Sequence, residues 1–149
     1  AVYAASDGNY GDLLKVPAGG SRQPATAQSV ELNLHFIYMK GREIFKLAVT
    51  KMLEASDIAL KMCNKKIQDL TYLIPHQANL RIIEAIVERV DIPREKVFIN
   101  LHKYGNMSSA TTVVAFDEVR KQGKVKKGDL VELIAFGAGL TWGAAVIKL

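Results

Sequence analysis

The chain has 149 residues, 49% of them hydrophobic, a formal net charge of +5 and a single cysteine, Cys63. This composition predicts one globular unit and lacks the charge blocks of disordered chains. No apolar run approaches the roughly 18 residues of a membrane span, and no secretory leader is recognisable, so we expect a soluble, cytoplasmic protein without membrane insertion. One cysteine excludes an internal disulfide framework and a multi-cysteine metal site, so no metal is expected. The basic residues are scattered among acidic ones without a nucleic-acid-binding motif, so nucleic acid is not expected as a partner.

The first part of the chain predicts little regular structure before one long helix. Residues 1–5 are expected to form a short strand, and the glycine-containing stretch 6–12 a turn. Residues 16–34 contain prolines and glycines without a periodic pattern, which predicts a long ordered loop. Apolar residues recur at helical spacing over residues 42–64, so a long helix that begins near Gly41 is predicted.

A strand-to-helix junction follows in the stretch LIPHQANLRIIEAIVERV. Residues 70–75 form an apolar run, and Pro75 both biases its neighbour toward extended geometry and ends the run. The helix that follows has one apolar stripe, made of Leu80, Ile83, Val87 and Val90. His76 therefore lies directly after a predicted strand.

A second junction of the same kind comes later in the chain. Residues 97–101 are predicted to form a strand, and after a short turn residues 108–123 form a helix. Ser108 or Ser109 can cap this helix, and a glycine can end it. Asn106 therefore lies between a strand and a helix, as His76 does.

The chain ends in two predicted strands, 129–136 and 140–149, which a tight Gly-Ala-Gly turn joins. Strands and helices that alternate in this way predict an α/β fold with a mostly parallel sheet, helices on its faces and an antiparallel final pair. Ligands of such sheets bind beyond the carboxyl ends of the strands. His76 and Asn106 both lie at such ends, so we expect them to converge if their strands are near neighbours.

A histidine after a strand is more often structural than catalytic, but the paired asparagine favours a functional interpretation. An imidazole N–H and an amide N–H aimed at one point can hold a carbonyl oxygen and stabilise the negative charge that develops on it. His76 and Asn106 therefore predict an oxyanion site without a nucleophile. His35 and His102 are expected to be solvated or hydrogen-bonded.

Two other features favour a structural interpretation from the residues alone. Cys63 lies near the C-terminal end of the long predicted helix, where the helix dipole disfavours a thiolate, so we expect an inert thiol. The stretch FGAGLTWG is most simply a hairpin turn. Its alternative role is to point backbone N–H groups into the crevice as a second oxyanion site.

Four motifs, MKGREIFKLAV, PHQANLRI, YGNMSSAT and FGAGLTWGAAVIKL, together resemble the C-terminal half of β-ketoacyl-acyl-carrier-protein synthase III. These thiolase-like condensing enzymes start type II fatty acid synthesis. The resemblance implies two similar α/β halves, each with a five-stranded, mostly parallel sheet, in an enzyme that is usually a homodimer. Residues 1–149 resemble only the second half, and the half that carries the cysteine nucleophile is absent from this chain.

The resemblance also implies roles for individual residues. His76 and Asn106 would bind the thioester carbonyl of malonyl-carrier protein and stabilise the enolate that forms as carbon dioxide leaves. The backbone N–H of Ala138 would belong to the hole for the tetrahedral acyl intermediate. The positions that match the pantetheine tunnel and its wall are Asn79, Gly41, Phe136, Phe45 and Met39. Lys46 and Arg81 match positions that dock the acidic acyl carrier protein.

The implied substrates are an acyl-coenzyme A primer and malonyl-carrier protein with its phosphopantetheine arm, without a separate cofactor. Two residues depart from the family pattern: Ala138 replaces a glycine, and Met107 replaces a threonine. Chalcone-synthase-like polyketide enzymes also use a histidine and an asparagine, whereas elongating synthases use two histidines and thiolases a second cysteine. A polyketide condensing enzyme and a non-catalytic fragment that binds pantetheine therefore stay open as alternatives.

Overall fold

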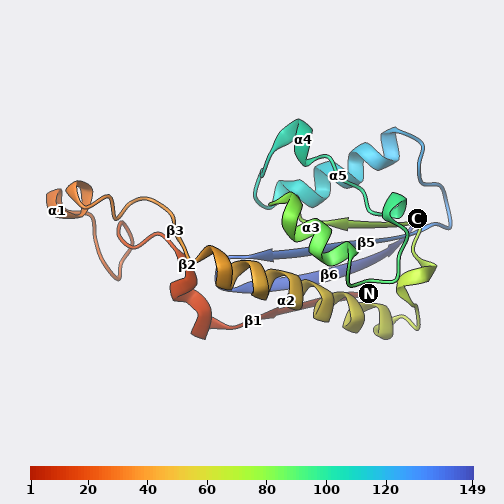
Figure 1. The fold of residues 1–149 in the computed structure, drawn as a ribbon, viewed down its shortest axis with the longest axis horizontal. Helices are drawn as coiled ribbons and strands as arrows, with labels where there is room; N and C mark the ends of the chain where they lie inside the picture. Colours follow the sequence, from red (N-terminus) through yellow and green to blue (C-terminus); the bar gives the residue numbers. More distant parts are fainter.

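The computed structural model describes residues 1–149 and has a central sheet with helices on both faces (Figure 1). The sheet has four strands in the order β1-β6-β5-β4. Its strands are β1 (Val2–Ser6), β4 (Tyr72–Pro75), β5 (Leu130–Gly137) and β6 (Thr141–Lys148). The helices that accompany it are α2 (Gly41–Met62), α3 (Leu80–Val87), α4 (Leu101–Tyr104) and α5 (Ala110–Lys121). None of them is long and apolar enough to cross a membrane.

The two faces of the sheet carry separate hydrophobic cores. Side chains alternate along β5, so Ile134 and Phe136 join the larger core under α2 and α3, while Val131 joins the smaller core under α5. Ala115 and Val119 supply the buried face of α5. The sheet is therefore held between α2 with α3 on one side and α5 on the other, as an α/β fold requires.

The predicted α/β fold with a mixed sheet is confirmed, but the sheet has four strands and not five, and most of its strand pairs are antiparallel. Only β4 and β5 pair in parallel, with Ile74 opposite Leu133. β6 is antiparallel to β5 and also to β1, which forms the edge of the sheet. The alternation of strands and helices did not reveal this because the first strand returns to pair with the last one, across nearly the whole length of the chain.

The predicted strand 97–101 is also absent as a strand. Val97 makes an isolated bridge to Leu73, and the N–H of Phe98 donates to the Leu73 carbonyl at 3.0 Å. The next backbone donors, of Asn100 and Leu101, bond instead to the side-chain oxygen of Gln77 at 3.0 and 3.2 Å. This side chain ends the pairing and α4 begins.

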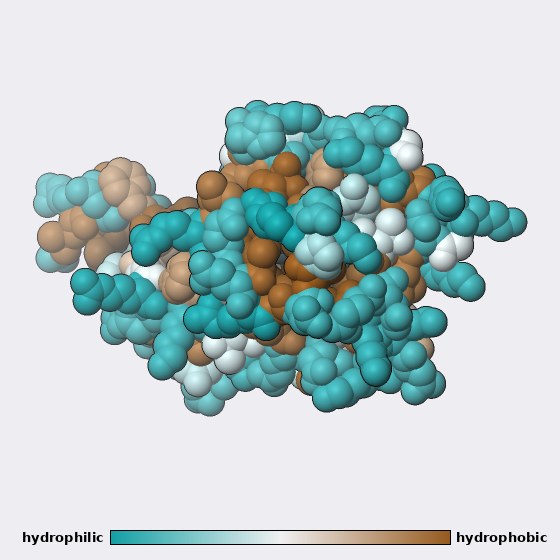
Figure 2. Space-filling model, turned by 45° about the vertical axis from the view of Figure 1, so that its right-hand side comes forward, coloured by the Kyte–Doolittle hydropathy of each residue, from teal (hydrophilic) through white to brown (hydrophobic).

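Residues 8–39 form more regular structure than the predicted turn and loop. They contain a 3₁₀ helix (Gly8–Leu13), the strands β2 (Leu14–Lys15) and β3 (Tyr38–Met39), and the short helix α1 (Ala27–Glu31). Thr26 and Ser29 form a reciprocal capping box at the start of α1, with hydrogen bonds of 2.9 and 3.1 Å. This segment projects from the sheet (Figure 1) and exposes hydrophobic residues (Figure 2), among them Phe36 and Ile37.

The predicted helices are confirmed with small shifts at their ends. Two further 3₁₀ turns, Ile67–Asp69 and Arg94–Lys96, precede β4 and residue Val97. Ser109 occupies the N-cap position of α5, one of the two predicted positions, but its side chain makes no cap hydrogen bond. Ser108 precedes it with a φ of 57°. Gly123 ends α5 with a φ of 67°, as predicted.

A carboxyl group lies in the larger core. Glu132 is fully buried on β5, and its Oε2 accepts a hydrogen bond of 2.7 Å from the hydroxyl of Ser56 on α2. Its other oxygen has no partner in the chain. Burial raises the pKa of Glu132 to about 7. The folded state therefore holds a proton on this group that the unfolded chain loses at lower pH.

Because the pKa of Glu132 is higher in the folded than in the unfolded chain, its contribution to stability is complete below about pH 4.5 and is lost as the pH rises through about 7. Glu132→Gln removes this titration. The unfolding free energy of the variant minus that of wild type is therefore expected to be about 2 kcal/mol larger at pH 8 than at pH 5. Urea unfolding at both pH values measures this difference. The exposed Glu95→Gln is the control; an equal pH dependence in both variants would contradict the burial argument.

Candidate active site

His76 lies at the carboxyl end of the parallel pair β4 and β5. Its backbone N–H donates to the carbonyl of Ile134 at 2.8 Å, which continues the parallel pairing one residue beyond Pro75. β5 runs in the same direction, so Phe136 and the turn at Ala138 lie at the same edge of the sheet. The structure therefore brings His76 and the final hairpin turn to the same edge of the sheet.

The ring of His76 is held by a hydroxyl on α5. Nδ1 lies 2.5 Å from Oγ1 of the fully buried Thr111. The ring is partly buried, and this desolvation lowers the pKa of His76 below its ordinary value. Burial therefore favours the neutral form of the His76 imidazole. A neutral ring has one N–H to donate and suits hydrogen bonding to an oxygen that becomes negative.

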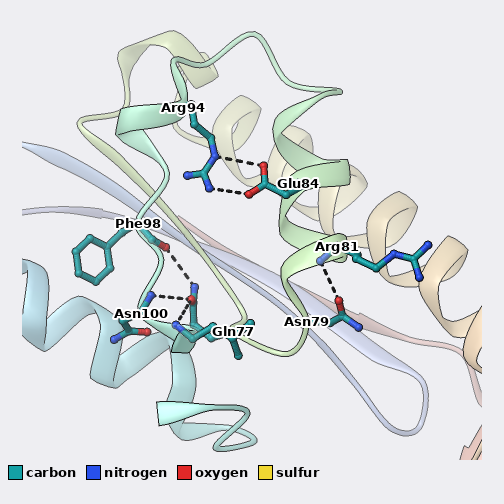
Figure 3. A network of polar contacts seen from close by, with 8 residues as sticks. Gln77, Asn79, Arg81, Glu84, Arg94, Phe98 and Asn100 are labelled. Carbon is teal, nitrogen blue, oxygen red and sulfur yellow. Dashed lines mark hydrogen bonds and ion pairs between the residues drawn. The ribbon is translucent and has the colours of Figure 1, made fainter. Parts of the chain in front are cut away.

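The buried amide of Gln77 joins the His76 turn to the segment that leads to Asn106 (Figure 3). Its nitrogen donates to the carbonyls of Pro75 and Phe98 at 2.7 and 3.2 Å. Its oxygen accepts the N–H groups of Asn100 and Leu101. These four bonds use the full donor capacity of the amide and both acceptor sites. Gln77 therefore fixes where the segment toward Asn106 starts.

Asn106 lies in the exposed loop between α4 and α5. The loop turns at Gly105, where φ is 66°. The Oδ1 of Asn106 accepts the N–H of Ser108 at 2.9 Å. This bond leaves the amide Nδ2 of Asn106 as the free donor, which is the polarity that an oxyanion site needs.

Asn79 begins α3, where its Oδ1 accepts the N–H of Arg81 at 2.8 Å as an N-cap (Figure 3). The guanidinium of Arg81 lies 5.8 Å from the centre of the Phe45 ring on α2. An ion pair of Arg94 with Glu84, at 2.7 Å, holds the outer side of α3 (Figure 3). The start of α3 therefore holds the Asn79 amide and the Arg81 guanidinium in place, with the guanidinium beside the Phe45 ring.

A cavity of about 1110 Å³ connects these elements, and twelve of its 21 lining residues are hydrophobic. His76, Asn106 and Ala138 all line it. The predicted tunnel and docking residues that also line it are Asn79, Gly41, Phe136, Phe45, Met39 and Arg81. Lys46 does not line the cavity and is exposed on α2. The structure thus gathers all the predicted site residues except Lys46 around one apolar space.

Ala138 adopts the turn without strain. Its φ is not positive, and the unusual φ of 136° falls on Gly139 instead. The Ala138 carbonyl accepts a bond of 3.2 Å from the Thr141 hydroxyl, whereas its N–H has no partner within the chain. Alanine at this position therefore preserves a free backbone donor at the cavity wall.

Cys63 lies outside the cavity at the C-terminal cap of α2. Its thiol donates to the carbonyls of Ala59 and Leu60 at 3.4 and 3.3 Å. Neither a helix N-terminus nor a cavity wall activates it, in agreement with the expectation of an inert thiol. No cluster of three metal-binding side chains occurs among residues 1–149.

A preparation of these 149 residues alone, mixed with acetyl-coenzyme A, is expected to leave Cys63 unmodified, because the thiol is bonded to helix carbonyls and not activated. Intact-mass spectrometry checks this result. A stable acetyl adduct mapped to Cys63 would overturn the assignment of this thiol as structural.

Sequence reasoning missed Gln77 and Thr111. A polar side chain directly after a buried strand must find hydrogen-bond partners, and this rule could have marked Gln77. Nothing local marked Thr111, because its contact with His76 depends on how α5 packs against the sheet.

The sheet, the helices on both faces and the cavity at the carboxyl ends of β4 and β5 define a thiolase-like α/β fold. Residues 60–149 match the family 3-Oxoacyl-[acyl-carrier-protein (ACP)] synthase III C terminal. The chain belongs to this family.

Individual relatives agree with the family match. The β-ketoacyl-[acyl-carrier-protein] synthase III of Clostridioides difficile (strain 630) is 53% identical over 147 residues, which are 99% of this chain and 45% of the relative. A crystal structure of 3-oxoacyl-[acyl-carrier-protein] synthase III from Aquifex aeolicus VF5 superposes with a TM-score of 0.86 at 41% identity, over all of this chain and 44% of that one. The priming β-ketosynthase of the R1128 polyketide pathway has a TM-score of 0.82 at 31% identity, over 99% of this chain and 44% of its own. The chain spans less than half the length of these relatives.

Proposed function

We propose that this chain is the C-terminal half of a 3-oxoacyl-[acyl-carrier-protein] synthase III and that it carries the decarboxylation site. The observation that supports this most is that the His76 ring and the Asn106 amide, whose Nδ2 has no partner within the chain, line one apolar cavity. The only thiol of the chain lies outside that cavity, so the nucleophile comes from the rest of the protein.

In the proposed reaction the thioester carbonyl oxygen of malonyl-carrier protein accepts hydrogen bonds from His76 and Asn106. The bond between the α-carbon and the carboxylate breaks, carbon dioxide leaves, and the electron pair forms an enolate whose negative oxygen the two donors stabilise. The enolate carbon then attacks the acyl thioester on the cysteine of the other half. The tetrahedral oxyanion accepts a hydrogen bond from the backbone N–H of Ala138, which has no partner within the chain. When the intermediate collapses, the bond to the cysteine sulfur breaks and the cysteine leaves as a thiolate.

The cavity suits the pantetheine arm of the two thioester substrates. Its apolar wall includes Phe45, Met39 and Phe136, and Asn79 and Gly41 lie beside it with polar groups for the amides of the arm. We propose that acyl-coenzyme A and malonyl-carrier protein enter in turn through this space. No metal or separate cofactor takes part in this scheme, and we expect the complete protein to be a cytoplasmic homodimer.

Arg81 and Lys46 are proposed to dock the acidic carrier protein. Both are exposed, and neither forms an ion pair within the chain. Arg81→Glu in the complete protein is expected to raise KM for malonyl-carrier protein about 10-fold, because reversal of a rim charge slows encounter with an acidic partner. Steady-state kinetics at low and high salt measure this effect. Lys127→Glu, the same charge change at an exposed residue outside the cavity lining, is the control, and equal KM values for both variants would contradict the docking role.

Likeness to a priming polyketide β-ketosynthase supports a second candidate function, the start of a polyketide chain. The two functions are separated by incubating the complete protein with acetyl-coenzyme A and malonyl-carrier proteins of fatty acid or polyketide synthesis, and by mass spectrometry of the products. We expect acetoacetyl-carrier protein from the fatty acid carrier. Product only with the polyketide carrier would favour the second function, and no product with either would favour a non-catalytic binding unit.

A further inference from the structure

We propose that Thr111 is a positioning residue that holds His76 in the tautomer with its hydrogen on Nε2. Oγ1 of Thr111 lies 2.5 Å from Nδ1 of His76 and 3.3 Å from the backbone nitrogen of Gln77. Thr111 is fully buried, so water does not compete for these contacts. This inference rests on the proposed function, because it assigns the ring nitrogen that faces the thioester.

The hydrogens at these three groups can be arranged in only one satisfactory way. The N–H of Gln77 donates to Oγ1, and Nδ1 is the one acceptor in contact with the hydroxyl, so the hydroxyl hydrogen points at Nδ1. The reverse arrangement, with a hydrogen on Nδ1, leaves a buried hydroxyl hydrogen without an acceptor, at a cost of about 1–3 kcal/mol. Nδ1 is therefore unprotonated, and the single hydrogen of the neutral ring lies on Nε2.

Thr111 lies in the first turn of α5, directly after the loop that carries Asn106. Its own N–H donates to the carbonyl of Ser108, and the N–H of Ser108 donates to Oδ1 of Asn106. The start of α5 therefore determines which side-chain atom of each site residue is left as a donor. The Thr111 hydroxyl does this for His76, and the backbone N–H of Ser108 does it for Asn106. Burial lowers the pKa of His76, which keeps the ring neutral and makes its tautomer decisive.

The tautomer is measured directly by ¹⁵N NMR of the complete protein with labelled histidine. Wild type and Thr111→Ser are expected to show His76 protonated on Nε2, whereas Thr111→Val, of similar shape but without the hydroxyl, is expected to shift toward the Nδ1–H form. A wild-type ring protonated on Nδ1 would overturn the proposal. This spectrum decides the question even if Thr111→Val fails to fold.

Activity provides a second readout. Thr111→Val is expected to slow malonyl decarboxylation about 10- to 100-fold, somewhat less than the about 10²- to 10³-fold that loss of an oxyanion donor costs. Acylation of the nucleophile should not change in Thr111→Val. Thr111→Ser should recover most of the decarboxylation rate. Thr112→Val, on the same turn of α5, is the control and should act as wild type. If Thr111→Val decarboxylates at the wild-type rate while His76→Ala is slow, the role of Thr111 is refuted and the proposed function is not. If His76→Ala also decarboxylates at the wild-type rate, the proposed function itself is wrong.

Discussion

His76→Ala is expected to slow decarboxylation of malonyl-carrier protein by at least about 10²-fold in the complete protein, while acylation of the nucleophile by acetyl-coenzyme A stays largely intact. The reason is that the proposed hydrogen bond forms to an oxygen that becomes negative only as carbon dioxide leaves. Release of labelled carbon dioxide measures the first step, and the mass of the acyl-enzyme measures the second.

His102→Ala is the matched control, because His102 is exposed on α4 and does not line the cavity. It is expected to leave both steps unchanged. Loss of both steps together in His76→Ala would point to a structural role for His76, since acylation does not use the proposed donor.

Gln77→Leu is expected to lower the unfolding free energy by about 3–5 kcal/mol. The change leaves the carbonyl of Pro75 and the N–H of Asn100, among other groups, buried without the partner they have now. Each buried backbone group without a partner costs about 1–3 kcal/mol, and partial rearrangement reduces the sum. Urea unfolding monitored by circular dichroism measures the loss.

Two further variants sharpen this test. Gln77→Glu keeps an oxygen for the N–H groups of Asn100 and Leu101 but loses the donor to the carbonyls, so it should still be clearly destabilised. Gln28→Leu, at an exposed position on α1, should be close to wild type. A loss in Gln77→Leu no larger than in Gln28→Leu would contradict the view that this amide holds the two segments together.

Hydrophobic periodicity was sufficient to predict α2, α3 and α5, because each buries one stripe against the sheet. It failed for residues 97–101, whose apolar pattern is that of a strand. There the amide of Gln77 binds the backbone of Asn100 and Leu101 and competes with the ladder. Such a contact between distant segments has no local signature in the sequence.

The residues of the candidate site also fall into those that the sequence could predict and those that it could not. His76 could be predicted because it follows a strand at the edge where α/β sheets bind ligands. Asn106 was predicted on a wrong premise, because residues 97–101 are not a strand and Asn106 follows α4; it lines the same cavity on a segment whose start Gln77 holds. The residues of the predicted tunnel wall, such as Phe45 and Met39, carry no signal of their own and came from family resemblance; they line the cavity because α2 and β3 close over it. Thr111 could not be predicted, because its hydroxyl meets His76 only when α5 packs on the sheet.

The central claim is that His76 and Asn106 donate to the same thioester oxygen. A crystal structure of the complete protein with a non-hydrolysable malonyl-pantetheine analogue tests it most directly. We predict the oxygen that replaces the thioester carbonyl within about 2.7–3.2 Å of both Nε2 of His76 and Nδ2 of Asn106. An analogue bound in the cavity with that oxygen held by other groups, or with only one of these two nitrogens within reach, would contradict the account.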